Sequence, residues 1–228
     1  FQFHTVNLNA PGFLESVREL ATKTGAVLIV DEVSSGFRLN TGGAHLLKGM
    51  EPDIAVFAKA MGNGYPIGAI IGRCDVMQAA QDTFISSTYW TERLGPAAAL
   101  ATIEKYKKYD VSQHLVETGR RVQDIWRRAA SKAGIEIDVG GIAPLSHFSF
   151  NGDEDLGMQT LYSQLMLDRG YLAGKSFYSC YAHTKAHLDG YEVATMEAFE
   201  IISQARDRGQ VTGLLMGPPA HKGFKRLT

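Results

Sequence analysis

Cysteine is scarce in this chain, which has only two among its 228 residues, Cys74 and Cys180. The two lie far apart, and neither stands in a CxxC or Cys/His spacing, so nothing in the sequence indicates a disulfide framework or a metal site. Such sparse cysteine usage is typical of a reducing compartment, and we expect a cytoplasmic protein.

Net charge and long apolar runs are lacking as well. The 23 Lys and Arg residues nearly balance 24 Asp and Glu residues, so no overall field favours nucleic acid or a membrane surface. No apolar run approaches the roughly 18 residues of a membrane-spanning helix, and the opening FQFHT does not resemble a signal peptide. We therefore expect a soluble protein with a small-molecule partner.

The hydrophobic pattern predicts an α/β layer in the first part of the chain. A helical period over 12–24 precedes the continuous apolar run 26–30, which is typical of a strand covered on both faces in a parallel sheet. Strand-like runs follow at 54–57, 69–71 and 84–86. We expect this sheet domain to span residues 1–109.

The second part of the chain predicts a smaller α+β domain. Helical patterns cover about 94–109 and 115–133, strand patterns cover 135–139 and 145–150, and two more helices follow at about 157–170 and 185–205. Thr184 stands where the last helix needs an N-cap. We assign residues 110–205 to an interdomain helix and this domain, and 206–228 to a loose basic tail.

Asp31 and Glu32 directly follow the first predicted strand, and the carboxyl ends of parallel strands commonly face a ligand. One interpretation is a magnesium-binding carboxylate of a nucleotide hydrolase. That interpretation requires a GxxxxGK[ST] phosphate loop, which this sequence does not contain. A carboxylate that merely caps the following turn is the structural alternative.

Lys59 ends the next apolar run and precedes a glycine-bearing loop with Gly62, Gly64 and Gly68. Desolvation at a buried strand end disfavours an ammonium, and a neutral amine is a nucleophile toward an aldehyde. The alternative is a lysine whose amine simply reaches solvent. The glycine spacing is a weak phosphate signal and better indicates tight turns.

Asp31 and Lys59 are 28 residues apart, each at the end of a predicted strand, so the two side chains can meet at one edge of the sheet. This combination suits pyridoxal 5'-phosphate (PLP). PLP needs a lysine amine for its aldehyde and a carboxylate that keeps its ring nitrogen protonated.

Four segments in order carry a family resemblance: GAVLIVDEVSSGFR at 25–38, EPDIAVFAKAMGNGYPIGAIIG at 51–72, STYWTERLGPAAALAT at 87–102 and FYSCYAHTKAHLDGYEVATMEAF at 177–199. Together they resemble the class III, fold-type I aminotransferases, with the glutamate-1-semialdehyde aminomutases as the most similar group. The resemblance covers about residues 11–205. It implies part of a fold-type I large domain, with a mainly parallel sheet and helices, followed by a smaller C-terminal α+β domain.

By position, the resemblance implies that Lys59 is the Schiff-base lysine and that Asp31 is the partner of the pyridinium nitrogen. Val33 would pack on the ring face. Thr91 would contact the cofactor phosphate, typically across the interface of a homodimer. Ser34 stands where many members carry a glutamine, which puts a hydrogen bond to the ring hydroxyl in doubt.

Several other positions have a structural interpretation beside the functional one. We interpret Glu32 and Arg38 as mainly structural, and Tyr89 and Trp90 as packing or interface aromatics. His147 and His183 either approach the active site or are ordinary polar residues of a strand and a helix cap.

The resemblance implies PLP-dependent transfer of an amino group between an amine or amino acid and an oxo compound, by an aminotransferase or an intramolecular aminomutase. Members of the family are much longer, and a chain that opens on Phe1 looks like the C-terminal half of one. The alternative hypothesis is a non-catalytic homologue or inactive fragment that only dimerises.

Overall fold

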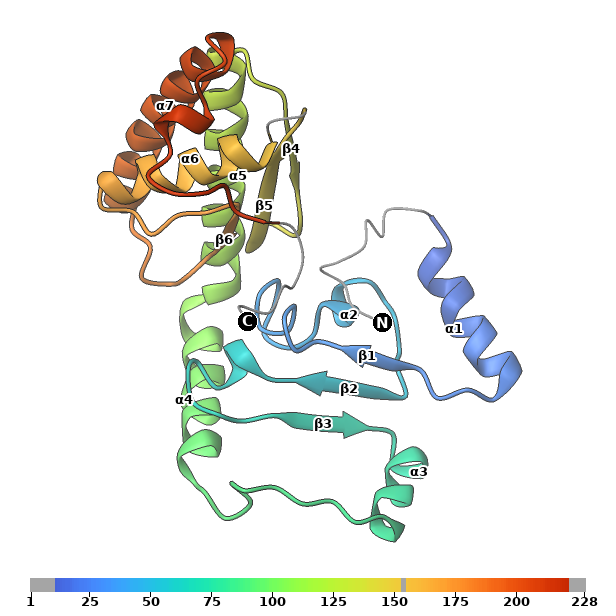
Figure 1. Cartoon of the computed structure of the whole chain (residues 1–228). Coiled ribbons are helices and arrows are strands. Elements are labelled where there is room, and N and C mark those ends of the chain that lie inside the picture. The colour runs from blue at the N-terminus through green and yellow to red at the C-terminus, as the bar shows by residue number, and fades with distance from the viewer. Residues whose placement is uncertain (1–10, 153–154, 222–228) are drawn as a thin grey trace. The chain divides into compact units, whose positions relative to one another are not determined.

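A computed structural model of the chain describes residues 11–152 and 155–221, which divide into two compact units, Phe1–Val116 and Glu117–Thr228. Figure 1 shows the elements of both. The first unit contains α1 (Phe13–Thr24), β1 (Ile29–Asp31), α2 (Ala44–Leu47), β2 (Ile54–Phe57), β3 (Ala69–Gly72), α3 (Cys74–Met77) and α4 (Leu94–Tyr109). Helix α5 (Val111–Ala133) leads into the second unit, which contains β4 (Ile137–Gly140), β5 (Leu145–Phe150), α6 (Asp155–Asp168), β6 (Ser176–Tyr178) and α7 (Lys185–Asp207).

The first unit is built on a three-stranded sheet in the order β1-β2-β3. Strand β1 pairs parallel with β2, while β3 pairs antiparallel with β2. One face of the sheet is buried at Val30, Ala55 and Phe57. The other face carries Ile29 and Ile70, two residues that are 46% and 62% exposed.

Two expectations about these strands are therefore wrong. The first strand is covered on one face instead of both, because none of the described elements packs over Ile29 and Ile70. The segment 84–86 forms no strand and lies in an irregular stretch, where Phe84 is 95% exposed. Its apolar pattern does not suffice, because a strand also needs a neighbour that pairs with its backbone.

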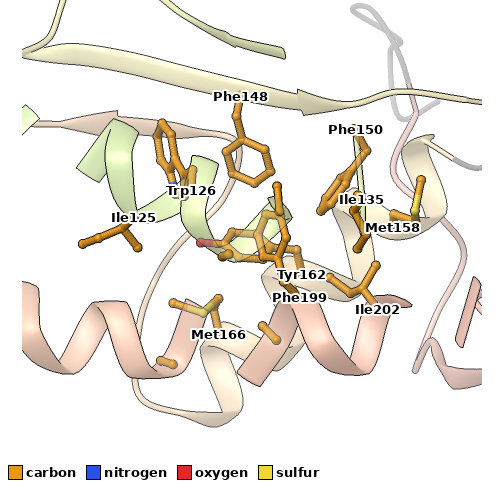
Figure 2. Packing of buried hydrophobic residues seen from close by; sticks show 14 of the residues in the cluster. Ile125, Trp126, Ile135, Phe148, Phe150, Met158, Tyr162, Met166, Phe199 and Ile202 are labelled. Atoms are coloured by element: carbon orange, nitrogen blue, oxygen red, sulfur yellow. The ribbon is translucent and has the colours of Figure 1, made fainter. Parts of the chain in front are cut away.

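The second unit packs its three long helices and the sheet β4-β5-β6 around one core (Figure 1). Phe148 of β5 lies at the centre, with its ring centroid 4.8 Å from Trp126, 5.2 Å from Tyr162 and 5.9 Å from Phe199. Figure 2 shows Phe148 and Phe150 pointing from their strand toward the helices. This core explains why the amphipathic patterns in the second half predict its helices well.

The start of α7 confirms the predicted cap. The Oγ1 of Thr184 accepts a hydrogen bond from the backbone N–H of His187 at 3.3 Å, and the Nδ1 of His187 accepts one from the backbone N–H of Thr184 at 3.2 Å. Reciprocal caps of this kind satisfy two backbone donors that the helix itself leaves unpaired.

The described segment after α7 packs on the second unit, contrary to the expectation of a loose tail. Val211 is fully buried in the core of that unit. The side-chain amide of Gln164 donates to the carbonyl of Leu214, and its oxygen accepts from the backbone N–H of Met216. The last part of the predicted tail, 222–228, lies outside the described residues.

Candidate functional site

The candidate site lies at the edge of the first sheet where β1 and β2 both end (Figure 1). Because these strands are parallel, their carboxyl ends meet at one edge. Asp31 is the last residue of β1 and pairs with Val56 of β2. Lys59 begins a short 3-10 turn two residues after β2 ends. The structure therefore brings the two predicted catalytic residues to the ends of neighbouring strands.

The carboxylate of Asp31 shapes the loop that follows it. Its Oδ1 accepts a hydrogen bond from the backbone N–H of Val33 at 2.8 Å. The backbone N–H of Gly36 donates to the carbonyl of Glu32 at 2.8 Å and closes the turn. A Cβ at position 36 would lie 2.7 Å from both that carbonyl and the ring of Phe57, so only glycine fits there.

The buried side chain of Glu32 stabilises this loop through hydrogen bonds. Its side chain is fully buried, and its Oε2 accepts from the hydroxyl of Ser35 at 2.5 Å. Its Oε1 accepts from the backbone N–H of His45 at 2.9 Å and lies 2.9 Å from the Nδ1 of the same residue. A buried carboxylate with several partners is a structural anchor, which supports the structural interpretation of Glu32.

Lys59 and Ser34 meet across the site. The Nζ of Lys59 donates a hydrogen bond to the Oγ of Ser34 at 2.6 Å. Lys59 has a left-handed backbone with φ of 47°, which is uncommon outside glycine. Such backbone conformations cluster at active sites. The side chain of Lys59 is exposed, so the expectation of a desolvated lysine is wrong for the described residues.

The other predicted residues are less closely grouped. Thr91 is exposed in a turn ahead of α4, and none of the hydrogen bonds described above for this edge involves it. Tyr89 and Trp90 are exposed in the same turn. His147 and His183 belong to the second unit.

Arg38 contacts the site loop through its guanidinium. Its Nε donates to the carbonyl of Ser34 at 3.2 Å. This bond helps to fix the backbone of Ser34. The contact supports the structural interpretation of Arg38.

Asp53 is a structural residue that the sequence analysis did not single out. Its buried carboxylate accepts from the backbone N–H of Leu28 at 2.7 Å and from Arg18 at 2.9 Å, and it lies 3.4 Å from Arg73. The bond from Leu28, followed by the two arginines, holds the pKa of Asp53 below its ordinary value of 3.8 against the opposing effect of burial. An Asp directly before an apolar run is too common a pattern to reveal such a role.

The described residues offer neither a metal-ligand cluster nor a membrane-spanning helix. No group of three or more His, Cys, Asp or Glu side chains is arranged to hold a metal ion there. Within the same residues, no helix is both long and apolar enough to cross a membrane.

Known proteins resemble the chain in sequence. The family model for class-III aminotransferases matches residues 5–142. The 3-aminobutyryl-CoA aminotransferase of Cloacimonas acidaminovorans is 34% identical, over 80% of this chain and 46% of its own length. The glutamate-1-semialdehyde 2,1-aminomutase of Heliobacterium modesticaldum is 35% identical, over 86% of this chain and 49% of its own length. The chain thus spans about half the length of the curated relatives it matches.

Solved structures resemble the chain as well. The FumI protein of Sphingopyxis sp. MTA144, solved in its PLP internal aldimine form, superposes with a TM-score of 0.84 and 25% identity, covering 91% of this chain and 52% of that one. A transaminase solved with PLP bound superposes with a TM-score of 0.77 and 25% identity, covering 86% of this chain and 49% of that one. Sequence and structure agree that the chain belongs to the class-III aminotransferase family and has part of its fold-type I architecture.

Proposed function

We propose that the protein is a PLP-dependent enzyme that transfers an amino group between an amine or amino acid and an oxo compound. The observation that carries the proposal is the placement of Lys59 and Asp31 at the ends of two adjacent parallel strands. An amine and a carboxylate at neighbouring strand ends are the two groups that PLP requires of a protein.

The residues present fit this cofactor. Lys59 is exposed, and Asp31 lies on the sheet face that the described elements leave open, so a ligand can reach both side chains. The loop from Asp31 to Gly36 is fixed by its own hydrogen bonds, which keeps the carboxylate in place without a ligand. Both similar structures were solved with PLP.

Each residue has a separate role in this proposal. Bound PLP supplies an electron-withdrawing ring. Lys59 would hold the cofactor through its amine and, once released, would move the proton at the α-carbon of the substrate. Asp31 would hold the proton on the ring nitrogen by a charge-assisted hydrogen bond. Val33 would pack against the ring.

The homodimer and the compartment are also part of the proposal. Thr91 would contact the cofactor phosphate, most simply from the neighbouring subunit, because Thr91 lies in an exposed turn. A site shared in this way requires a symmetric dimer. The sparse cysteines favour a cytoplasmic protein.

The substrate class follows from the relatives, one of which is an aminotransferase and another an aminomutase. We propose small amines or amino acids as amino donors and oxo compounds as acceptors. In an aminomutase the acceptor would be a neighbouring carbon of the same molecule.

A half-reaction screen tests the proposal. The full-length protein, loaded with PLP, is offered a panel of amines and amino acids, and conversion of the cofactor to its amine form is followed by absorbance. We expect conversion with at least one compound, its loss in Lys59→Ala, and its retention in Lys48→Ala, which removes an exposed lysine of the same unit. No conversion with any donor, or conversion by Lys59→Ala at the wild-type rate, contradicts the proposal.

A further inference from the structure

We infer that Ser34 is a positioning residue for the amine of Lys59. The inference rests on the proposed function, since it concerns how readily that amine reaches the cofactor aldehyde. It starts from the hydrogen bond that Lys59 Nζ donates to Ser34 Oγ at 2.6 Å, between residues 25 positions apart in sequence.

The backbone of Ser34 is held in place by hydrogen bonds of its loop. On one side, Asp31 accepts from the backbone of Val33. On the other, Ser35 is bonded to the buried carboxylate of Glu32. The carbonyl of Ser34 itself accepts from Arg38 at 3.2 Å. A serine whose backbone is already fixed loses little further conformational freedom when its hydroxyl binds the amine.

The backbone of Lys59 is fixed, whereas its long side chain can adopt many rotamers. The backbone N–H groups of Gly62 and Asn63 both donate to the carbonyl of Lys59 at 3.1 Å, which locks the turn. Four rotatable bonds still separate that backbone from Nζ, and lysine side chains carry large rotamer entropy. One hydrogen bond to a serine on a fixed loop therefore selects among the orientations of the amine.

The experiment measures how fast Lys59 captures PLP. Full-length apoprotein is mixed with PLP, samples are quenched with borohydride at timed intervals, and the reduced adducts at Lys59 and Lys48 are quantified by peptide mass spectrometry. Lys48 is exposed in the same unit and serves as the internal reference. The variants are Ser34→Ala, Ser34→Thr, which keeps the hydroxyl, and Ser16→Ala, a hydroxyl deletion on α1.

We expect the rate at Lys59 to fall about fivefold in Ser34→Ala, the rate equivalent of about 1 kcal/mol for one hydrogen bond. Ser34→Thr restores most of the rate, Ser16→Ala matches the wild type, and the rate at Lys48 stays constant in every variant. Matching thermal unfolding midpoints show that the fold is intact.

An unchanged or higher rate at Lys59 in Ser34→Ala overturns the inference, as does a Ser34→Thr variant as slow as Ser34→Ala. In those cases the wild type still forms the adduct, and the proposed function stands. A wild-type protein that forms no adduct at Lys59 overturns the proposed function and this inference together.

Discussion

At the scale of single residues, Asp31 has two roles that a substitution can separate. Its Oδ1 accepts a hydrogen bond from the loop backbone, and its negative charge would hold the proton on the cofactor's ring nitrogen. Asp31→Asn keeps an Oδ1 that can accept from the backbone of Val33 at 2.8 Å, so we expect the fold to persist. The amide cannot hold a proton on a ring nitrogen as a carboxylate does. Exchange of the substrate α-proton, followed by NMR in D2O, should slow by about 100-fold or more.

The matched control for this variant is Asp75→Asn. Asp75 is an exposed partner of Arg73 on α3 of the same unit, outside the loops that carry Asp31 and Lys59. Its variant should exchange the proton at the wild-type rate. Equal exchange rates in Asp31→Asn and the wild type would show that Asp31 is not the partner of the ring nitrogen.

Asp53 makes stability depend on pH. Its folded-state pKa lies below the ordinary 3.8, chiefly because the backbone of Leu28 donates to it. A lowered folded-state pKa contributes stability above the unfolded pKa, and this contribution is lost as the pH falls through the folded value. Asp53→Asn should therefore be less stable than the wild type at pH 7.

Urea titrations at pH 7, 5 and about 3 check this prediction. The gap in unfolding free energy between the wild type and Asp53→Asn should narrow at the lowest pH and hold steady between pH 5 and 7. Asp82→Asn, in the same unit, controls for the loss of one negative charge. A gap that stays constant down to the lowest pH contradicts the role of the carboxylate.

The residues of the site show what a sequence can and cannot predict. Asp31 and Lys59 stand at strand ends because the apolar runs before them form strands, and that pattern is local. The bond between Ser34 and Lys59 joins two loops 25 residues apart, and no local pattern contains it. The left-handed backbone of Lys59 is a feature of a single residue, which the sequence does not specify.

At the scale of elements, the loop between β1 and α2 depends on the buried Glu32. Glu32→Ala would leave the hydroxyl of Ser35 and the backbone N–H of His45 without their acceptor inside the protein. Losing a buried charged partner costs about 3 kcal/mol, so we expect the free energy of unfolding to fall by that amount. Urea denaturation of the full-length protein measures it.

Glu19→Ala is the matched control, because Glu19 is exposed on α1 of the same unit and alanine favours helix. It should change the free energy of unfolding by less than about 0.5 kcal/mol. A Glu32→Ala variant as stable as Glu19→Ala would mean that Glu32 does not brace the loop.

Elements that a local sequence pattern defines could be predicted, whereas elements that depend on pairing with a distant strand could not be predicted as well. Helix α4 and strands β2 and β5 have the predicted bounds, because an alanine-rich helical sequence and short strand-like patterns define them. Strand β1 is shorter than its apolar run, since the ladder with β2 begins only at Ile29. The run at 84–86 stays irregular for want of a partner strand.

At the scale of the whole molecule, one face of the first sheet is apolar and open in the described residues. Ile29, Ile54 and Ile70 share this face, and β3 is an edge strand with Ile70 well exposed. Open apolar edge strands favour self-association. We expect these 228 residues, expressed alone, to self-associate and to bind PLP weakly.

Ile70→Lys should reduce this self-association, because a charge on the open face opposes pairing. Static light scattering at increasing protein concentration measures it. Leu172→Lys alters a fully exposed leucine of the second unit and should have a smaller effect. A wild-type 228-residue chain that stays monomeric at all concentrations contradicts the role of the open face.

The most direct test of the central claim is to locate the covalent bond to PLP. The full-length protein is saturated with PLP, reduced with borohydride, digested and analysed by mass spectrometry. We predict one stoichiometric pyridoxyl adduct, on Lys59, which disappears in Lys59→Ala. A stoichiometric adduct on another lysine, or no adduct above the background of exposed lysines, would contradict the assignment of Lys59 as the residue that holds the cofactor.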